Sequence, residues 1–107
     1  MKITLSPARK DEILTVFKSG DALTLNGEVF DFGPLDEGET LPADAIESEW
    51  ITGDVTRTDG VLRLTLRLPH GANAPEETRF PEPIIDPPDG EIALPPYSNP
   101  EVENVED

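Results

Sequence analysis

The stretch Leu62-Arg63-Leu64-Thr65-Leu66-Arg67-Leu68 decides the fold of this chain. Its leucines occupy every second position and alternate with polar residues, as in a β-strand with one apolar and one polar face. A helix would scatter the same leucines around its circumference. The dipeptide Asp59-Gly60 stands just before this strand and suits the two-residue type I′ turn of a β-hairpin. The stretch therefore predicts the second strand of a hairpin.

The turn at Asp59-Gly60 also predicts the register of that hairpin. Counting back from the turn pairs Thr58 with Val61, Arg57 with Leu62, Val55 with Leu64, Gly53 with Leu66, and Ile51 with Leu68. Ile51 and Val55 then lie on the leucine face, so turn chemistry and side-chain alternation give the same answer. Trp50 falls on the opposite face, where it either covers the second side of the sheet or is an exposed anchor.

Two further turns predict a three-stranded meander over residues 12–32. Asn26-Gly27 suits a type I′ turn and pairs Leu25 with Glu28, whereas Gly20-Asp21 suits a type II′ turn and pairs Val16 with Leu25. With this register the meander has a single apolar face, formed by Leu14, Val16, Leu23, Leu25, Phe30 and Phe32.

Weaker signals mark the remaining segments. Met1–Leu5 reads as an edge strand, although Ser6-Pro7 is also a suitable start for one helical turn. Residues 41–46 suit another such turn. Asp89-Gly90 suggests a short peripheral hairpin between residues 84–85 and 92–94.

Taken together, these elements predict an all-β fold of small antiparallel sheets built from hairpins, packed as a sandwich or an open barrel. We expect a single β domain over residues 1–97 and a disordered acidic tail over residues 98–107, because the tail has four acids, two valines and no aromatic residue. The expected core is the apolar face of the meander together with Ile51, Val55 and the four alternating leucines.

Charge and composition exclude several classes of function. The chain has 107 residues, 23 acidic and 8 basic side chains, and a formal net charge of -15. Binding to nucleic acid or to an anionic membrane needs clustered lysine and arginine, so both are disfavoured. Without cysteine the chain forms no disulfide or thiolate metal site, which favours a reducing compartment. We expect no secretory signal and no membrane-spanning segment, because no apolar run approaches ~20 residues.

No candidate for catalysis or metal binding outweighs a structural interpretation. His70 is the single histidine, and we expect it to face water or to bond a backbone carbonyl rather than to act as a base or ligand. The acidic stretches at residues 36–39 and 86–91 do not match a calcium loop. Arg63 and Arg67 form either an anion patch or, as we favour, charge pairs with Asp54 and Asp59. The sequence predicts no catalytic residue, no metal site and no cofactor.

Some side chains are candidates for contact with another protein. The aromatic and Pro-rich stretch Leu94-Pro95-Pro96-Tyr97 resembles ligands that dock in aromatic grooves, but we favour a strand end that exits rigidly into the tail. The loop at residues 70–79 is the other candidate contact surface. The candidate contact residues are Trp50, His70, Asn73, Arg79 and Tyr97.

Several runs of the sequence resemble a family of small acidic proteins encoded by bacteriophages and prophages. The most specific run is Leu-Pro-His-Gly-Ala-Asn-Ala-Pro-Glu at residues 68–76, and shorter runs lie at residues 23–28, 30–32 and 50–55. The resemblance extends from about residue 1 to Tyr97. It implies a product of tail-region genes, located in the bacterial cytoplasm or the phage particle, and it implies no catalytic residues.

We therefore expect a non-enzymatic phage accessory protein that contacts other phage proteins in the tail or its assembly. A second hypothesis is an acidic inhibitor that mimics nucleic acid and occupies a host DNA-binding protein, as the charge of -15 suggests. That hypothesis requires a contiguous acidic face and salt-dependent binding. An enzyme or a calcium-binding protein is the weakest of the three. The oligomeric state is open.

Overall fold

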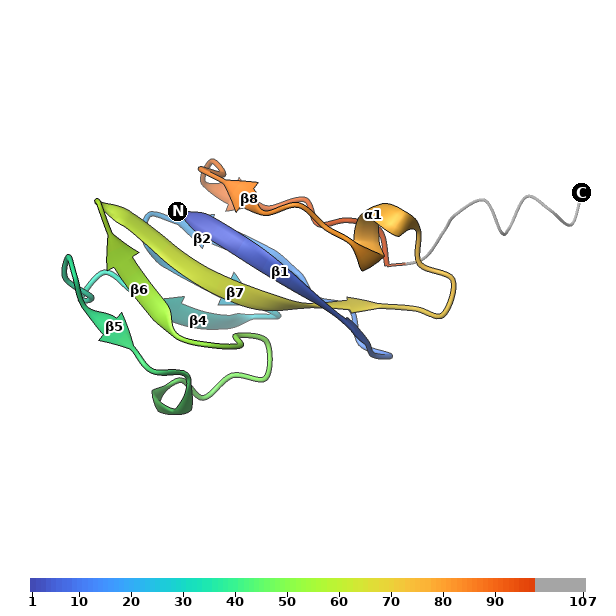
Figure 1. Ribbon diagram of the computed structural model, residues 1–107, viewed down its shortest axis with the longest axis horizontal. Coiled ribbons are helices and arrows are strands. Elements are labelled where there is room, and N and C mark those ends of the chain that lie inside the picture. The colour runs from blue at the N-terminus through green and yellow to red at the C-terminus, as the bar shows by residue number, and fades with distance from the viewer. Residues whose placement is uncertain (98–107) are drawn as a thin grey trace, which may run out of the picture.

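Residues 1–97 of the computed structural model form two β-sheets that lie one behind the other (Figure 1). The all-β prediction is confirmed, since helical structure is limited to the 3-10 helix η1 (Ala43–Ala45) and the single turn α1 (Glu76–Arg79) within the described residues. η1 falls where residues 41–46 predicted a helical turn. The predicted tail, residues 98–107, lies outside the described part.

The first sheet has the order β5-β6-β7-β1-β8, and the second has the order β4-β3-β2-β9. In the first sheet the strands are β1 (Lys2–Arg9), β5 (Thr40–Leu41), β6 (Val55–Thr58), β7 (Val61–His70) and β8 (Ile84–Ile85). In the second they are β2 (Val16–Ser19), β3 (Ala22–Leu25), β4 (Glu28–Asp31) and β9 (Gly90–Glu91).

The three main predicted hairpin turns are present with the predicted pairing. Asp59 and Gly60 have positive φ angles of 54° and 75°, as a type I′ turn requires, and Arg57 lies opposite Leu62. In the meander, Leu25 lies opposite both Val16 and Glu28. These turns were predictable because each is specified by two adjacent residues and by the alternation on either side.

The predicted register of the first hairpin is wrong beyond Gly53. Ile51 pairs with Leu66 instead of Leu68, so the pairing has slipped by two residues. Gly53 has a φ angle of 79°, which only glycine adopts readily, and it interrupts the ladder between Thr52 and β6. Because the slip is an even number of residues, Ile51 keeps its buried face.

The strand predicted at Met1–Leu5 is present, but it extends to Arg9, so the alternative of a helical turn at Ser6-Pro7 is wrong. The strand lies between β7 and the short β8 instead of at the edge of the sheet. β1 runs through Ser6 and Pro7 to Arg9 and pairs in parallel with β7 along its whole length. The amide of Lys10 donates to the carbonyl of His70, so by alternation the nitrogen of Pro7 faces away from β7. β8 pairs only with Lys2 and Ile3 on that side, so the missing amide of Pro7 costs no ladder bond.

The predicted hairpin around Asp89-Gly90 does not form. β8 pairs antiparallel with β1 in the first sheet, and β9 pairs antiparallel with β2 in the second. Pro87 and Pro88 lie between them and cannot donate ladder bonds. The segment therefore crosses between the sheets and joins one edge of each.

The core lies between the two sheets and contains every residue that was predicted for it, with Phe30 partly buried. Ile3 and Leu5 from β1, Trp50, and Ile92 are buried there as well. Ile3, Leu5 and Ile92 were missed because their segments pair with strands distant in the sequence, whereas Trp50 was expected on the face opposite the leucines. No helix within residues 1–97 has the length and hydropathy needed to cross a bilayer.

Asp89 fastens the crossing segment to the second sheet. Its Oδ1 accepts hydrogen bonds from Lys18 Nζ at 2.8 Å and from the Gly20 amide at 3.1 Å. The hydrogen bond from Lys18, then that from Gly20, and then the charge of Lys18 lower the pKa of Asp89 below its ordinary value. A carboxyl group with a lowered pKa stabilises the folded state above its unfolded pKa, and this contribution is lost as pH falls through the folded pKa.

We expect Asp89→Asn to lower the thermal midpoint at pH 7. The difference from the wild type should shrink once the pH falls below the ordinary pKa of an aspartate, about 4, because the unfolded state then binds a proton that the folded wild type, with its lowered pKa, binds only at lower pH. Thermal unfolding followed by circular dichroism at pH 7 and pH 3 measures this. Asp44→Asn is the matched control, because the Asp44 side chain makes no hydrogen bond within residues 1–97. An equal difference at both pH values would contradict the prediction.

Candidate interaction surface

The loop after β7 is held in place by the C-terminal segment of the described chain. The amide of Gly71 donates to the carbonyl of Tyr97 at 2.8 Å. The hydroxyl of Thr78, in α1, donates to the carbonyl of Pro96 at 2.6 Å. Gly71 and Thr78 are buried, so both bonds are shielded from water. The predicted contact loop at residues 70–79 is thus a fixed structure.

Tyr97 closes this end of the molecule. Its hydroxyl donates a hydrogen bond to the carbonyl of Lys10. A Cβ atom on Gly71 would lie 3.0 Å from Cε1 of the Tyr97 ring, so this close approach depends on glycine. The stretch ending at Tyr97 is therefore folded onto the domain, and its tyrosine is not free to act as a docking ligand. The strand predicted at residues 92–94 is absent, because β9 ends at Glu91.

We expect Tyr97→Phe to lower the free energy of unfolding by about 1 kcal/mol, because the carbonyl of Lys10 loses its partner while the ring contact with Gly71 remains. Urea denaturation measures the loss, and amide shifts of Lys10 and Asp11 in NMR spectra locate it. Unchanged stability together with unchanged shifts would show that the hydroxyl does not hold this end.

His70 has a structural environment. It is the last residue of β7 and is half-buried, and its Nδ1 lies 2.9 Å from the carbonyl oxygen of Gly71. This agrees with the predicted bond to a backbone carbonyl. No group of three or more histidine, cysteine, aspartate or glutamate side chains within residues 1–97 is arranged to hold a metal ion.

Trp50 is buried, with 6% of its surface exposed, so the alternative of an exposed anchor is wrong. The ammonium group of Lys10 lies 5.5 Å from the centroid of the Trp50 ring and covers it. Lys10 also bonds His70 and Tyr97 through its backbone. Three of the five predicted contact residues thus meet around Lys10, where they stabilise one end of the sandwich.

The other two predicted contact residues, Asn73 and Arg79, are exposed. Asn73 lies in the loop, and its side chain makes no hydrogen bond to the rest of residues 1–97. Arg79 is the last residue of α1; its Nε donates to the carbonyl of Ala74 at 3.2 Å, and its guanidinium group lies 5.8 Å from the centroid of the Phe80 ring. These side chains are available to a partner.

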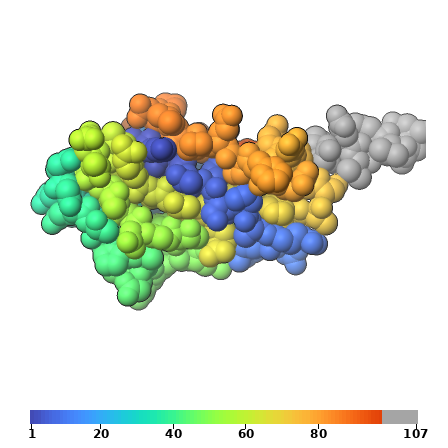
Figure 2. Space-filling view, viewed as in Figure 1, coloured from blue at the N-terminus to red at the C-terminus, as the bar shows by residue number. Residues whose placement is uncertain are grey.

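Phe80 is the surface residue that the sequence did not single out. It follows α1, 71% of its surface is exposed, and it borders a hollow of about 410 Å³ beside β1. Figure 2 shows the orange segment after α1 next to the blue atoms of β1. β8 pairs only with Lys2 and Ile3, so it does not extend along β1 to Leu5, and the hollow stays open there. In the sequence, the one feature that could have indicated an exposed Phe80 is that this residue belongs to no alternating apolar face.

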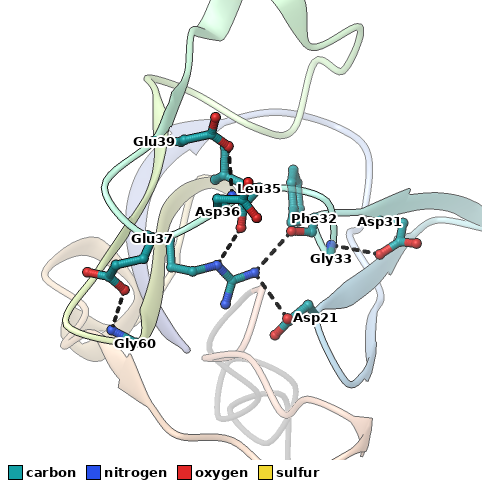
Figure 3. A network of polar contacts seen from close by, with 10 residues as sticks. Asp21, Asp31, Phe32, Gly33, Leu35, Asp36, Glu37, Glu39 and Gly60 are labelled. Carbon is teal, nitrogen blue, oxygen red and sulfur yellow. Dashed lines mark hydrogen bonds and ion pairs between the residues drawn. The ribbon is translucent and has the colours of Figure 1, made fainter.

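The most connected polar group is Arg57, which joins the two sheets. From β6, its Nε donates to the carbonyl of Leu35 at 2.6 Å. Its Nη2 donates to the carbonyl of Phe32 at 3.1 Å and to the carboxylate of Asp21 at 3.1 Å. Figure 3 shows these three residues around the guanidinium group. The geometry satisfies backbone carbonyls and leaves no chemistry to perform, so the role of Arg57 is structural.

The predicted charge pairs of Arg63 and Arg67 with Asp54 and Asp59 do not form. Neither arginine makes an ion pair within the described residues, and Arg67 Nε donates instead to the carbonyl of Glu49 at 3.1 Å. Asp54 accepts a hydrogen bond from the amide of Ala43 at 2.9 Å. The two-residue slip at Gly53 moves Asp54 away from the position opposite Thr65.

Several carboxylates are used to bind backbone amides at turns. Glu37 accepts bonds from the amides of Asp59 and Gly60 at 2.6 and 2.8 Å, and Asp31 accepts one from Gly33 at 2.9 Å. Other acids lie on turns and loops of both sheets. The carboxylates of Glu37 and Asp31 therefore stabilise turns of the fold.

A scan against models of protein families, a search of curated proteins and a search of solved structures each found no match to this chain.

Proposed function

We propose that this chain is a non-enzymatic accessory protein of a bacteriophage or prophage, which acts through protein–protein contacts in the tail or during its assembly. The phage setting is supported by the resemblance of residues 68–76 and the shorter runs. The mode of action is supported by the surface at one end of the domain.

The observation that carries the proposal is the exposed Phe80 on a fixed support. An exposed aromatic side chain beside a hollow is typical of a contact surface, because burying it against a partner removes apolar area from water. Here the support is α1 and the preceding loop, which are bonded to Pro96 and Tyr97. A surface that is already ordered loses little entropy when it binds.

Mass spectrometry of purified virions and affinity purification with individually expressed tail proteins test this function. We expect the chain in the virion or in a complex with a named tail protein, with binding reduced by Phe80→Ala. The matched control is Ile13→Ala, which removes an exposed apolar side chain in the loop between β1 and β2 and should leave binding unchanged. Absence from virions and from every tail-protein complex would overturn the proposal.

A further inference from the structure

The hollow beside β1 has an apolar lining and an acidic rim. Glu77 of α1 and Glu82, in the segment that leads to β8, supply the carboxylates. Its volume of about 410 Å³ falls in the range of ~300–1,000 Å³ typical of pockets that bind small groups. The apolar lining consists of Leu5, Phe80, Ile84, Ala93 and Pro95.

We propose that this hollow binds the side chain of an arginine or lysine flanked by apolar residues, presented by an extended segment of a partner protein. This assignment rests on the proposed function, because it names the chemistry of the contact. Long basic side chains combine an apolar stem with a charged head. The stem would pack on Phe80 and Ile84, and the head would meet the carboxylates of Glu77 and Glu82.

The charges around the hollow favour a basic occupant. Glu77 and Glu82 are exposed and form no ion pair within residues 1–97. Arg79 is the nearby base along the chain, and it is already placed by its bond to Ala74 and by its position over the Phe80 ring. Glu76, the neighbour of Glu77 in α1, is a further carboxylate in this part of the chain. The rim is therefore net negative, in a chain whose net charge of -15 attracts basic partners over a distance.

Two other occupants are disfavoured by the same charges. A second copy of the chain would bring a net charge of -15 against a rim that is itself acidic. The sequence of residues 98–107 contains four acids and no base, so it would place like charges beside Glu77 and Glu82. A basic segment of another protein meets neither repulsion.

The test is an NMR titration of the full chain with the acetylated and amidated peptide Gly-Leu-Arg-Leu-Gly. We expect saturable shifts at the amides of Leu5, Glu77, Phe80 and Ile84. A peptide with glutamine in place of arginine should bind about fivefold more weakly, which corresponds to two exposed ion pairs. Saturable shifts confined to the exposed Phe17 and Val29 of the second sheet, or no saturable shifts, would overturn the proposal.

Charge variants distinguish an effect of the carboxylates at the hollow from an effect of the net charge of the chain. The double variant Glu77→Gln with Glu82→Gln should weaken arginine-peptide binding about fivefold and leave glutamine-peptide binding unchanged. The matched control, Glu28→Gln with Glu47→Gln, removes the same charge from exposed positions elsewhere and should bind as the wild type does. Equal weakening in both double variants would show that net charge alone attracts the peptide, and the proposal would fail.

Phe80→Ala tests the apolar part, and the fold should tolerate it because the ring is exposed. We expect binding of both peptides to weaken severalfold, and unchanged binding would contradict a role of Phe80 in the hollow. The virion experiment stays independent of these results. Peptide binding without incorporation or a tail-protein complex would remove the phage function alone, and incorporation without peptide binding would remove this assignment alone.

Discussion

Leu66→Ala is expected to lower the free energy of unfolding by about 3 kcal/mol. Leu66 has no exposed surface and lies near the middle of β7, between Leu5 of β1 and Ile51 on the other side. Removing its isobutyl group loses the transfer free energy of that group and leaves a cavity that the flanking β-branched and leucine side chains fill only in part.

Equilibrium urea denaturation measures this loss, with two probes to test for two-state behaviour. A domain of this size has a stability of only ~5–15 kcal/mol, so the shift in midpoint should be large. Ile13→Ala removes a comparable aliphatic group from an exposed position and should change stability by less than about 1 kcal/mol. Similar losses in both variants would show that the sheets do not pack around Leu66 as described.

Arg57→Met is expected to lower the free energy of unfolding by about 2–3 kcal/mol, because the carbonyls of Phe32 and Leu35 lose their donor. The Arg57 side chain is 16% exposed, whereas that of Asp21 is 45% exposed. Most of the loss should therefore come from the unpaired carbonyls rather than from the ion pair. Methionine keeps the length of the aliphatic stem, so packing changes little.

A double-mutant cycle with Asp21→Asn separates the two contributions. We expect Asp21→Asn alone to cost less than about 1 kcal/mol, as exposed ion pairs do, and the coupling energy with Arg57→Met to be equally small. Both are measured by urea denaturation. A coupling energy that accounts for most of the Arg57→Met loss would mean that the salt bridge, and not the carbonyl contacts, joins the sheets.

Local features of the sequence were sufficient to predict part of the candidate interaction surface. The bond of His70 to a backbone carbonyl was predicted from its isolation among possible ligands. The strand predicted at residues 92–94 is absent, and the bond that holds Tyr97 was not predicted. Phe80 was not found, because its exposure depends on where β8 stops along β1. Trp50 was left open between two alternatives, and only the tertiary structure shows that it is buried, with Lys10 over its ring.

Short-range patterns in the sequence specify the hairpins, because adjacent turn residues and period-2 alternation act within a few residues of one another. They also specify the leucine face of β7 and most of the core. The parallel pairing of β1 with β7, the division of β8 and β9 between the sheets, and the contacts of Arg57 were decided only by the tertiary structure. These interactions join segments far apart in the chain, so neither partner carries a local pattern that identifies the other.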